Sequence, residues 1–217
     1  MSFASLTALG TTSNVLNARV RLPAWGIWSA LVTLDRGDVN LTGPVVLTFG
    51  PLTLQGTIRR GQAFVGRGQY RIFGGADGWS QTIPAHSYRG PANLSTIAKD
   101  AAALVGETVV MDQNGEKLIG PYARMEGYAS DLLNLYTPGR WWVENDGITH
   151  IGDRASIPAP SVRVLDFDPD RGIVTYSDDS LFVSPAQSFN TGTISGTVST
   201  VFHDLEGGTL RSEIYLQ

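Results

Sequence analysis

Cysteine is absent from this sequence of 217 residues, which excludes disulfide bonds and thiolate sites. The sequence also lacks an apolar run of the roughly 18 residues that indicate a transmembrane helix. Its first residues have neither the basic start nor the continuous apolar stretch of a signal peptide. We therefore expect synthesis and assembly in a cytoplasm, with stability supplied by packing or by subunit association.

Positive charge is also scarce. The chain has 16 Lys and Arg against 20 Asp and Glu, a net charge of −4 and a pI near 5.3. This balance argues against a nucleic-acid-binding protein that depends on a basic surface. With 42% hydrophobic and 17% charged residues, the chain can bury a core and is not disordered as a whole. Its length fits one large domain or two small ones.

The 25 glycines and 11 prolines fall between short runs rich in Val, Ile, Thr, Tyr and Trp, which predicts many strands and many turns. In the first half of the chain, the predicted strands are 19–22, 27–34, 45–49, 52–60, 63–65 and 69–73. This density of strands is typical of a small barrel. In the second half, the predicted strands are 141–143, 148–151, 162–167, 172–176 and 181–183, with Asp146-Gly147 as a hairpin turn.

Between these halves the hydrophobic period changes. Apolar residues recur every three or four positions over 94–105, with Asn93 or Ser95 available as N-cap and Gly106 as the C-terminal stop. A second, shorter helix is predicted over about 126–136, before Pro138-Gly139. Because it is short, this second helix needs a packing partner.

The C-terminal stretch 192–216 predicts a β-hairpin that turns at Glu206-Gly207-Gly208. A lone hairpin is only marginally stable, so this one should close a barrel or sandwich. The predicted fold class is therefore mainly β with a small helical part. We expect an N-terminal β-barrel domain over 1–89, a helical connector over 90–139 and a C-terminal β-barrel domain over 140–217, with possible exchange of strands between the barrels.

One loop has the composition of a metal site. Asp166, Asp168 and Asp170 resemble the start of a calcium loop. However, the glycine comes one residue late, Pro169 stiffens the loop, and Ser177 stands where a glutamate is needed. A solvated turn, in which Asp and Pro serve the backbone geometry, is therefore the favoured interpretation.

No motif for catalysis emerges. The three histidines, His86, His150 and His203, lack metal-like spacing, so surface or packing roles are favoured. Glu144 and Asp146 could be a glycosidase pair, but they flank a turn and are explained by it. We therefore predict no enzymatic activity, no cofactor and no metal.

The five tryptophans could stack on sugar rings or fill a core. Trp141 and Trp142 are adjacent on a strand, so their side chains must point to opposite faces. One face should be a core. In a small protein the other is most economically a subunit interface.

Several segments, in order along the chain, resemble the small hub proteins of tailed-phage baseplates. They are 18–23, 26–34, 54–61, 70–76, 139–143, 146–147, 151–152, 196–203 and 210–213. The resemblance implies a structural virion protein with two tube-type barrels that assembles as a homotrimer. Three chains with two barrels each would present six similar units, which can bridge a three-fold spike and a six-fold tail tube.

The expected location is the tail baseplate of a virion, after synthesis in the host cytoplasm. The expected partners are further copies of the chain, the tail tube protein, the central spike protein, and baseplate wedge or tape-measure proteins, without specific nucleic-acid binding or membrane insertion. The predicted interface residues are Trp28, Trp141 and Trp142. The alternative is a carbohydrate-binding or carbohydrate-cleaving β protein of the tail, which would require exposed, clustered tryptophans beside paired carboxylates.

Overall fold

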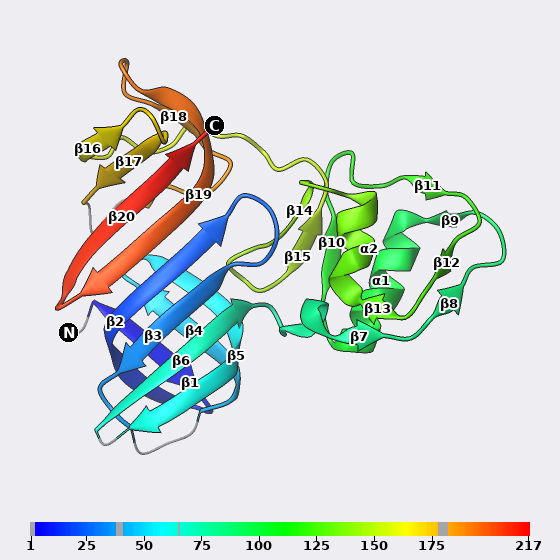
Figure 1. Ribbon diagram of the computed structural model, residues 1–217, viewed down its shortest axis with the longest axis horizontal. Helices are drawn as coiled ribbons and strands as arrows, with labels where there is room; N and C mark the ends of the chain where they lie inside the picture. Colours follow the sequence, from blue (N-terminus) through cyan, green and yellow to red (C-terminus); the bar gives the residue numbers. More distant parts are fainter. Residues whose placement is uncertain (1–2, 38–40, 65, 178–181) are drawn as a thin grey trace.

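A computed structural model describes residues 3–37, 41–64, 66–177 and 182–217. Figure 1 shows a β part, made from the two ends of the chain, beside a smaller part built around two helices. The prediction of a mainly β fold with a small helical part is confirmed.

The first six strands form a closed barrel. They are β1 (Ala4–Ala8), β2 (Thr11–Pro23), β3 (Ser29–Leu34), β4 (Gly43–Phe49), β5 (Leu52–Phe64) and β6 (Arg67–Gly74). The order around the barrel is β1-β4-β5-β6-β3-β2, and pairing between β1 and β2 closes it. Strand β5 combines the two segments predicted at 52–60 and 63–65, although Val65 itself lies outside the described residues. Strand β1 and the first half of β2 were not predicted.

Strand β2 belongs to two structures at once. Near its start it pairs with β1, up to Asn14, whereas from Ala18 onward the same edge pairs with β19. The C-terminal strands continue outward from this point as an antiparallel ladder in the order β2-β19-β20-β17-β16. These strands are β16 (Val164–Asp168), β17 (Ile173–Tyr176), β18 (Ser188–Asn190), β19 (Ser195–Glu206) and β20 (Thr209–Leu216). Among the described residues this ladder stays open.

The terminal hairpin is confirmed as β19 and β20. It turns at Gly207 and Gly208, whose φ angles of 57° and 82° suit the tight turn that matches strand twist. The strand predicted at 181–183 is not found at Phe182 and Val183, and Leu181 lies outside the described residues.

The helical part holds α1 (Leu94–Val105), α2 (Ala129–Tyr136) and the short 3₁₀ helix η1 (Gly78–Ser80). Helix α1 has the predicted bounds, with Asn93 as N-cap and Gly106 at φ 73° as C-cap. Helix α2 begins later than predicted, at Ala129, because the Asp131 carboxylate accepts the backbone N–H of Tyr128 and caps the helix there.

Short strands surround the helices. Strand β10 (Val109–Met111) runs parallel to β15 (Thr149–Ile151), which pairs in turn with β14 (Trp141–Val143). Three two-stranded ribbons complete this part: β7 (Thr82–Ile83) with β13 (Gly127–Tyr128), β8 (His86–Ser87) with β12 (Ala123–Arg124), and β9 (Ala92–Asn93) with β11 (Leu118–Ile119). Neither helix among the described residues is long and apolar enough to cross a membrane.

The hairpin predicted at Asp146-Gly147 is present as β14 and β15. Its sheet partner is β10, so residues 141–151 pair with the helical part and not with the C-terminal ladder. The division into 1–89, 90–139 and 140–217 stays a prediction, but the strand pairings cross its second boundary. The reason is that β10 lies 40 residues upstream of its partner β15, and local sequence carries no signal for such pairing.

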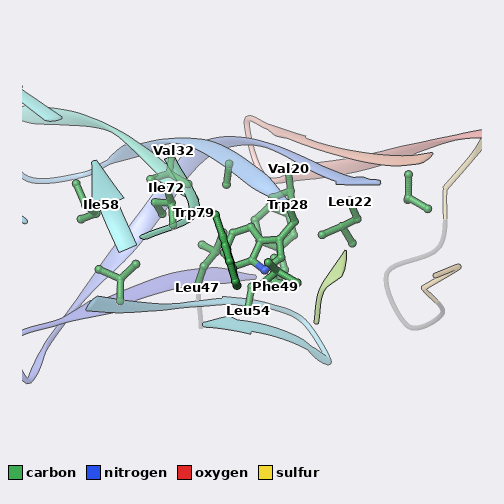
Figure 2. Packing of buried hydrophobic residues seen from close by; sticks show 14 of the residues in the cluster. Val20, Leu22, Trp28, Val32, Leu47, Phe49, Leu54, Ile58, Ile72 and Trp79 are labelled. Carbon is green, nitrogen blue, oxygen red and sulfur yellow. The ribbon is translucent and has the colours of Figure 1, made fainter. Parts of the chain in front are cut away.

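The barrel core is organised around Trp28 (Figure 2), which is 1% exposed. Gly56 of β5 and Gly74 of β6 pair with each other, and both lie against the Trp28 ring, where a β-carbon would collide with it. Trp79 lies next to this cluster, and its Nε1–H donates to the Thr149 hydroxyl at 2.8 Å. This bond links η1, which follows the last barrel strand, to β15. It therefore connects the end of the barrel to the helical part.

Candidate assembly surfaces

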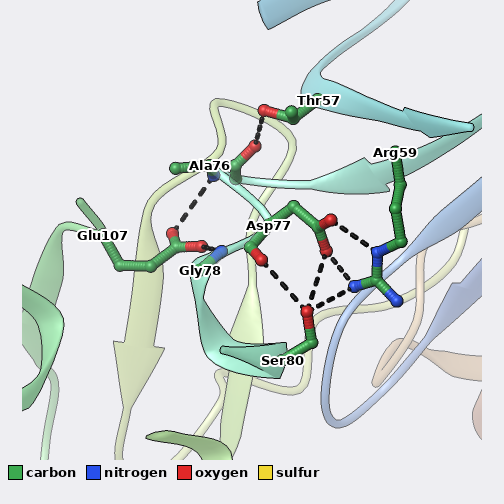
Figure 3. A network of polar contacts seen from close by, with 8 residues as sticks. Thr57, Arg59, Ala76, Asp77, Gly78, Ser80 and Glu107 are labelled. Carbon is green, nitrogen blue, oxygen red and sulfur yellow. Dashed lines mark hydrogen bonds and ion pairs between the residues drawn. The ribbon is translucent and has the colours of Figure 1, made fainter. Parts of the chain in front are cut away.

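Residues 75–80 connect the barrel to the helical part and are held from both sides (Figure 3). On the barrel side, the Arg59 guanidinium of β5 donates to both Asp77 carboxylate oxygens, and the Thr57 hydroxyl donates to the Gly75 carbonyl at 2.9 Å. On the helical side, the Glu107 carboxylate accepts the Gly78 N–H at 2.7 Å. The connection is therefore a fixed joint between the two parts.

Glu107 is the buried charge of this joint. Burial raises the pKa of its carboxyl group, and the backbone N–H groups of Gly78 and Ala76 oppose that rise by donating to the carboxylate. A side chain at Gly78 would meet the Val105 carbonyl and the Glu107 stem, so only glycine allows this close approach.

Trp141 and Trp142 point to opposite faces of β14, as predicted. Trp141 packs against Trp79, with ring centroids 6.3 Å apart, and its Nε1–H donates to the Asn134 side chain of α2 at 3.1 Å. Trp142 stacks on His150 with centroids 5.3 Å apart. The second face of β14 is therefore a small polar and aromatic cluster.

This cluster holds its charges in pairs. The Glu144 carboxylate accepts the Trp142 Nε1–H at 2.9 Å and lies 3.3 Å from the Arg154 guanidinium. Burial lowers the pKa of Arg154, and the nearby Glu144 opposes that change. Asp112 lies 2.8 Å from His150 Nδ1. A cleft of about 690 Å³ opens beside these groups.

Chemically, the Asp112–His150 pair could share a proton. Among the described residues His150 has no hydrogen bond to a nucleophile, and Trp142 is 4% exposed and covered by its neighbours. The pair Glu144 and Asp146 does not face a common space either, because Glu144 is bonded to Trp142 and Arg154 while Asp146 caps its own turn at Ile148 N–H. Among the described residues, this cleft therefore shows no histidine hydrogen-bonded to a nucleophile.

The predicted interface tryptophans are all buried inside the chain. Trp28 is 1% exposed, Trp141 6% and Trp142 4%, whereas Trp25 is 39% exposed and lies edge-on to Trp142. The structure brings Trp141 and Trp142 to one strand and leaves Trp28 in the barrel. The interface role of these three tryptophans stays a prediction. The more exposed Trp25 and the groups around it are better placed for contact with a partner.

The histidines have packing roles. His86 lies edge-on to Tyr88, and His150 stacks on Trp142. His203 is buried in the C-terminal ladder, where burial lowers its pKa to about 3 and its Nδ1 lies 2.8 Å from the Ser212 hydroxyl. Among the described residues no three His, Asp or Glu side chains gather as metal ligands.

The aspartate loop at the β16–β17 connection forms a turn, as interpreted from the sequence. The Asp168 carboxylate accepts the backbone N–H groups of Asp170 and Arg171, at 3.1 and 3.2 Å. The Asp166 carboxylate accepts the N–H of Phe167. These carboxylates therefore stabilise the local backbone.

One face of the sheet is uncovered where the barrel meets the C-terminal ladder. It forms a hollow of about 740 Å³ across β6, β3, β2, β19 and β20. Arg19 and Asp204 face each other across the β2–β19 pairing, 3.6 Å apart, and the exposed Leu31 lies beside Arg19 on β3. The Arg19 guanidinium also lies over the Phe202 ring. Such a mixed apolar and charged surface suits contact with protein.

The described arrangement, a closed barrel extended by a shared strand into an antiparallel ladder with a small helical part, is the fold of phage tail proteins. The 43 kDa tail protein of prophage MuSo2 from Shewanella oneidensis matches with a TM-score of 0.66 and 7% identity, over 99% of this chain and 97% of that protein. The tail protein from Neisseria meningitidis MC58 matches with a TM-score of 0.67 and 12% identity, over 99% and 95%.

A third similar structure comes from E. coli. It is described as a component of the type VI secretion system with structural similarity to T4 bacteriophage tail proteins, and it matches with a TM-score of 0.62 and 11% identity, over 98% of this chain and 76% of that one. No family model matches this sequence, and neither does any curated protein.

Sequence reasoning missed two features of these surfaces. Glu107 was not singled out, because its partners are backbone N–H groups some 30 residues upstream. The arginines of the β5–β6 hairpin were also missed. Their signal was available, because Arg59, Arg60, Arg67 and Arg71 occur in a stretch without any acidic residue.

Proposed function

We propose that this protein is a structural component of a phage tail and acts as its baseplate hub. In this role a homotrimeric ring joins the central spike to the tail tube, and wedge or tape-measure proteins contact its outside. The main support is that the match to two tail proteins extends over nearly the full length of both chains, so this chain has the fold of a whole tail protein and not only a common barrel. The proposed location is the baseplate of the virion.

The fixed joint at Glu107 and Asp77 supports a structural role. A hub must transmit orientation from spike to tube, and a rigid connection between the barrel and the helical part would serve that purpose. The alternative of a carbohydrate-binding protein gains no support, because four of the five tryptophans are buried and none stacks beside an open carboxylate pair.

The test is the mass and symmetry of the assembled protein. Native mass spectrometry of the purified chain should show a trimer, and negative-stain images of that species should show a three-fold ring with a central opening. In isolated tails that carry the protein, the copy number should be a multiple of three. A different copy number, or a strict monomer within the tail, would contradict the proposal.

A further inference from the structure

Two long strands of the barrel extend beyond their barrel partners. Strand β2 leaves β1 after Asn14, and its freed edge is taken by β19. Strand β5 leaves β4 in the same way, since its last pair with β4 is Ile58 with Gly43. Beyond that point β5 pairs only with β6 among the described residues. The first extension is thus occupied within the chain, and the second has no partner on this edge among the residues that the structure describes.

The extension of β5 is exposed to solvent. Residues 59–63 are all exposed, and the pairing of β5 with β6 has a register shift between Ile58 and Arg60. On one face the buried Tyr70 ring lies across Gly61 and Gly68, where side chains would collide with it. An exposed strand with one unpaired edge is a natural site for a further strand.

The second free edge lies at the opposite end of the same sheet. Counting β5 itself, the sheet runs through eight strands in the order β5-β6-β3-β2-β19-β20-β17-β16. Strand β16 pairs only with β17 among the described residues, so its outer edge is open. The exposed Leu165 lies on this strand at a register shift between Val164 and Asp166. One chain therefore presents two different free edges, one at each end of one curved sheet (Figure 1).

The two ends carry opposite charge. The β5–β6 hairpin has four arginines and no acidic residue over 59–71. Arg59 is paired with Asp77, whereas Arg60, Arg67 and Arg71 have no ion pair among the described residues. At the other end, Asp166, Asp168 and Asp170 follow one another, and Glu213 lies on the same row of the sheet as Asp166. Arg171 lies 3.8 Å from Asp168, and Arg163 precedes the strand, so these two arginines reduce the net negative charge of this end without cancelling it.

Strand directions also agree. All seven pairings along this path are antiparallel, so the first and the last of the eight strands run in opposite directions. When a copy is rotated about an axis roughly along the strands, its β5 extension runs antiparallel to the β16 edge of the next copy. A contact between two different patches, repeated by rotation, gives a closed ring if the rotation closes and a filament if it does not.

We propose that the open edge of β16 pairs with the β5 extension of a second copy of this chain, guided by the attraction between the aspartates of one end and the arginines of the other. The contact buries Leu165 and gives both free edges their missing hydrogen bonds. This inference rests on the proposed ring and names the surfaces that form it. It moves the interface from the buried tryptophans to the two ends of the sheet.

The first test is a charge exchange. Arg60→Glu and Asp166→Arg should each weaken the trimer, raising the concentration at which it dissociates by roughly fivefold or more, since each change replaces attraction with repulsion. The double variant R60E/D166R should restore association, because each interface again joins opposite charges. Lys99→Glu, an exposed change of the same charge on α1, is the matched control and should leave the trimer unchanged. Mass measurements across a dilution series provide the readout.

The second test uses the absence of cysteine. In a variant with Gln62→Cys and Leu165→Cys, a short bis-maleimide should link copies into covalent trimers visible on a denaturing gel. The pair Leu104→Cys and Leu165→Cys, with one site moved to the exposed face of α1, should not form closed trimers.

The outcomes separate the two levels of inference. A wild-type trimer that resists both charge reversals and gives no covalent trimer would overturn the β16–β5 contact while leaving the ring intact. A wild-type protein that stays monomeric at the highest soluble concentration, and in which the cysteine pair is not cross-linked, would overturn the contact and the ring together. Rescue by the double charge exchange, together with covalent trimers, supports the contact.

Discussion

The packing of Trp28 against Gly74 can be used to test how the barrel core is stabilised. A β-carbon at Gly74 would lie 2.5 Å from Trp28 Nε1 and 2.6 Å from Cδ1, about 1 Å closer than ordinary contact. Overpacking of this kind costs about 1–3 kcal/mol of unfolding free energy. All three atoms nearest to that β-carbon belong to the five-membered ring of Trp28, so the cost of Gly74→Ala should depend on that ring.

Trp28→Leu removes the indole rings and leaves a shorter, flexible side chain that can turn away from Gly74. It also removes the Nε1–H, which is buried without a partner among the described residues, so part of the packing loss is offset. In the Trp28→Leu background, Gly74→Ala should cost less than about 0.5 kcal/mol, which gives a coupling energy of about 0.5–2.5 kcal/mol. Urea unfolding of the four proteins in this cycle measures it.

Two glycines serve as controls. A β-carbon at Gly56 would lie 2.4 Å from the Phe73 carbonyl oxygen, a backbone atom, so Gly56→Ala should stay costly in both backgrounds. Gly120 has open space around it, and Gly120→Ala should change stability by less than about 0.5 kcal/mol. Equal costs of Gly74→Ala with Trp28 and with leucine at position 28 would refute the packing argument.

Two further predictions concern buried polar groups. Burial lowers the pKa of His203 to about 3 from the ordinary 6.5, so below pH 6.5 the unfolded chain binds a proton that the folded chain does not. The contribution of His203 to the free energy of unfolding should therefore be complete above pH 6.5 and fall by about 1.4 kcal/mol per pH unit below it. His203→Gln should flatten this part of the pH profile measured by urea unfolding. Persistence of the full slope in that variant would assign it to other groups. Glu107→Ala should destabilise the protein by about 1–3 kcal/mol, because the Gly78 N–H loses its acceptor. For the same reason, hydrogen exchange at the Gly78 amide should become faster. Unchanged exchange would mean that the joint does not depend on Glu107.

The elements predicted correctly from sequence are those with strong local signals. Helix α1 shows a 3.6-residue period between Asn93 and Gly106, and the terminal hairpin turns at two adjacent glycines. Strand β1 was missed because Ala4 and Ala8, which face the core, differ little in hydrophobicity from Ser5 and Thr7 between them. Local contrast, rather than burial itself, decides what sequence reasoning can find.

Features that depend on distant partners could not be predicted in this way. The burial of Trp28 follows from Gly56 and Gly74, and the placement of β14 follows from its neighbour β15 pairing with β10. The tryptophans were correctly divided between two faces of β14, but the second face is closed by His150 and Arg154, which the strand pattern does not reveal. The free ends of the sheet likewise appear only when the strand order is known.

The sharing of β2 has a consequence for synthesis on the ribosome. On one edge Ala18 pairs with Val32 of β3, which is made soon afterwards, but its partner on the other edge, Leu205, lies near the end of the chain. At about 5–20 residues per second, the edge of β2 from Ala18 to Pro23 waits roughly 10–40 s after emerging before β19 is made. The first barrel can close during that interval. The nascent chain therefore carries an unpaired strand edge for most of its synthesis. During this time, nascent chains on neighbouring ribosomes could pair with each other through these edges and aggregate.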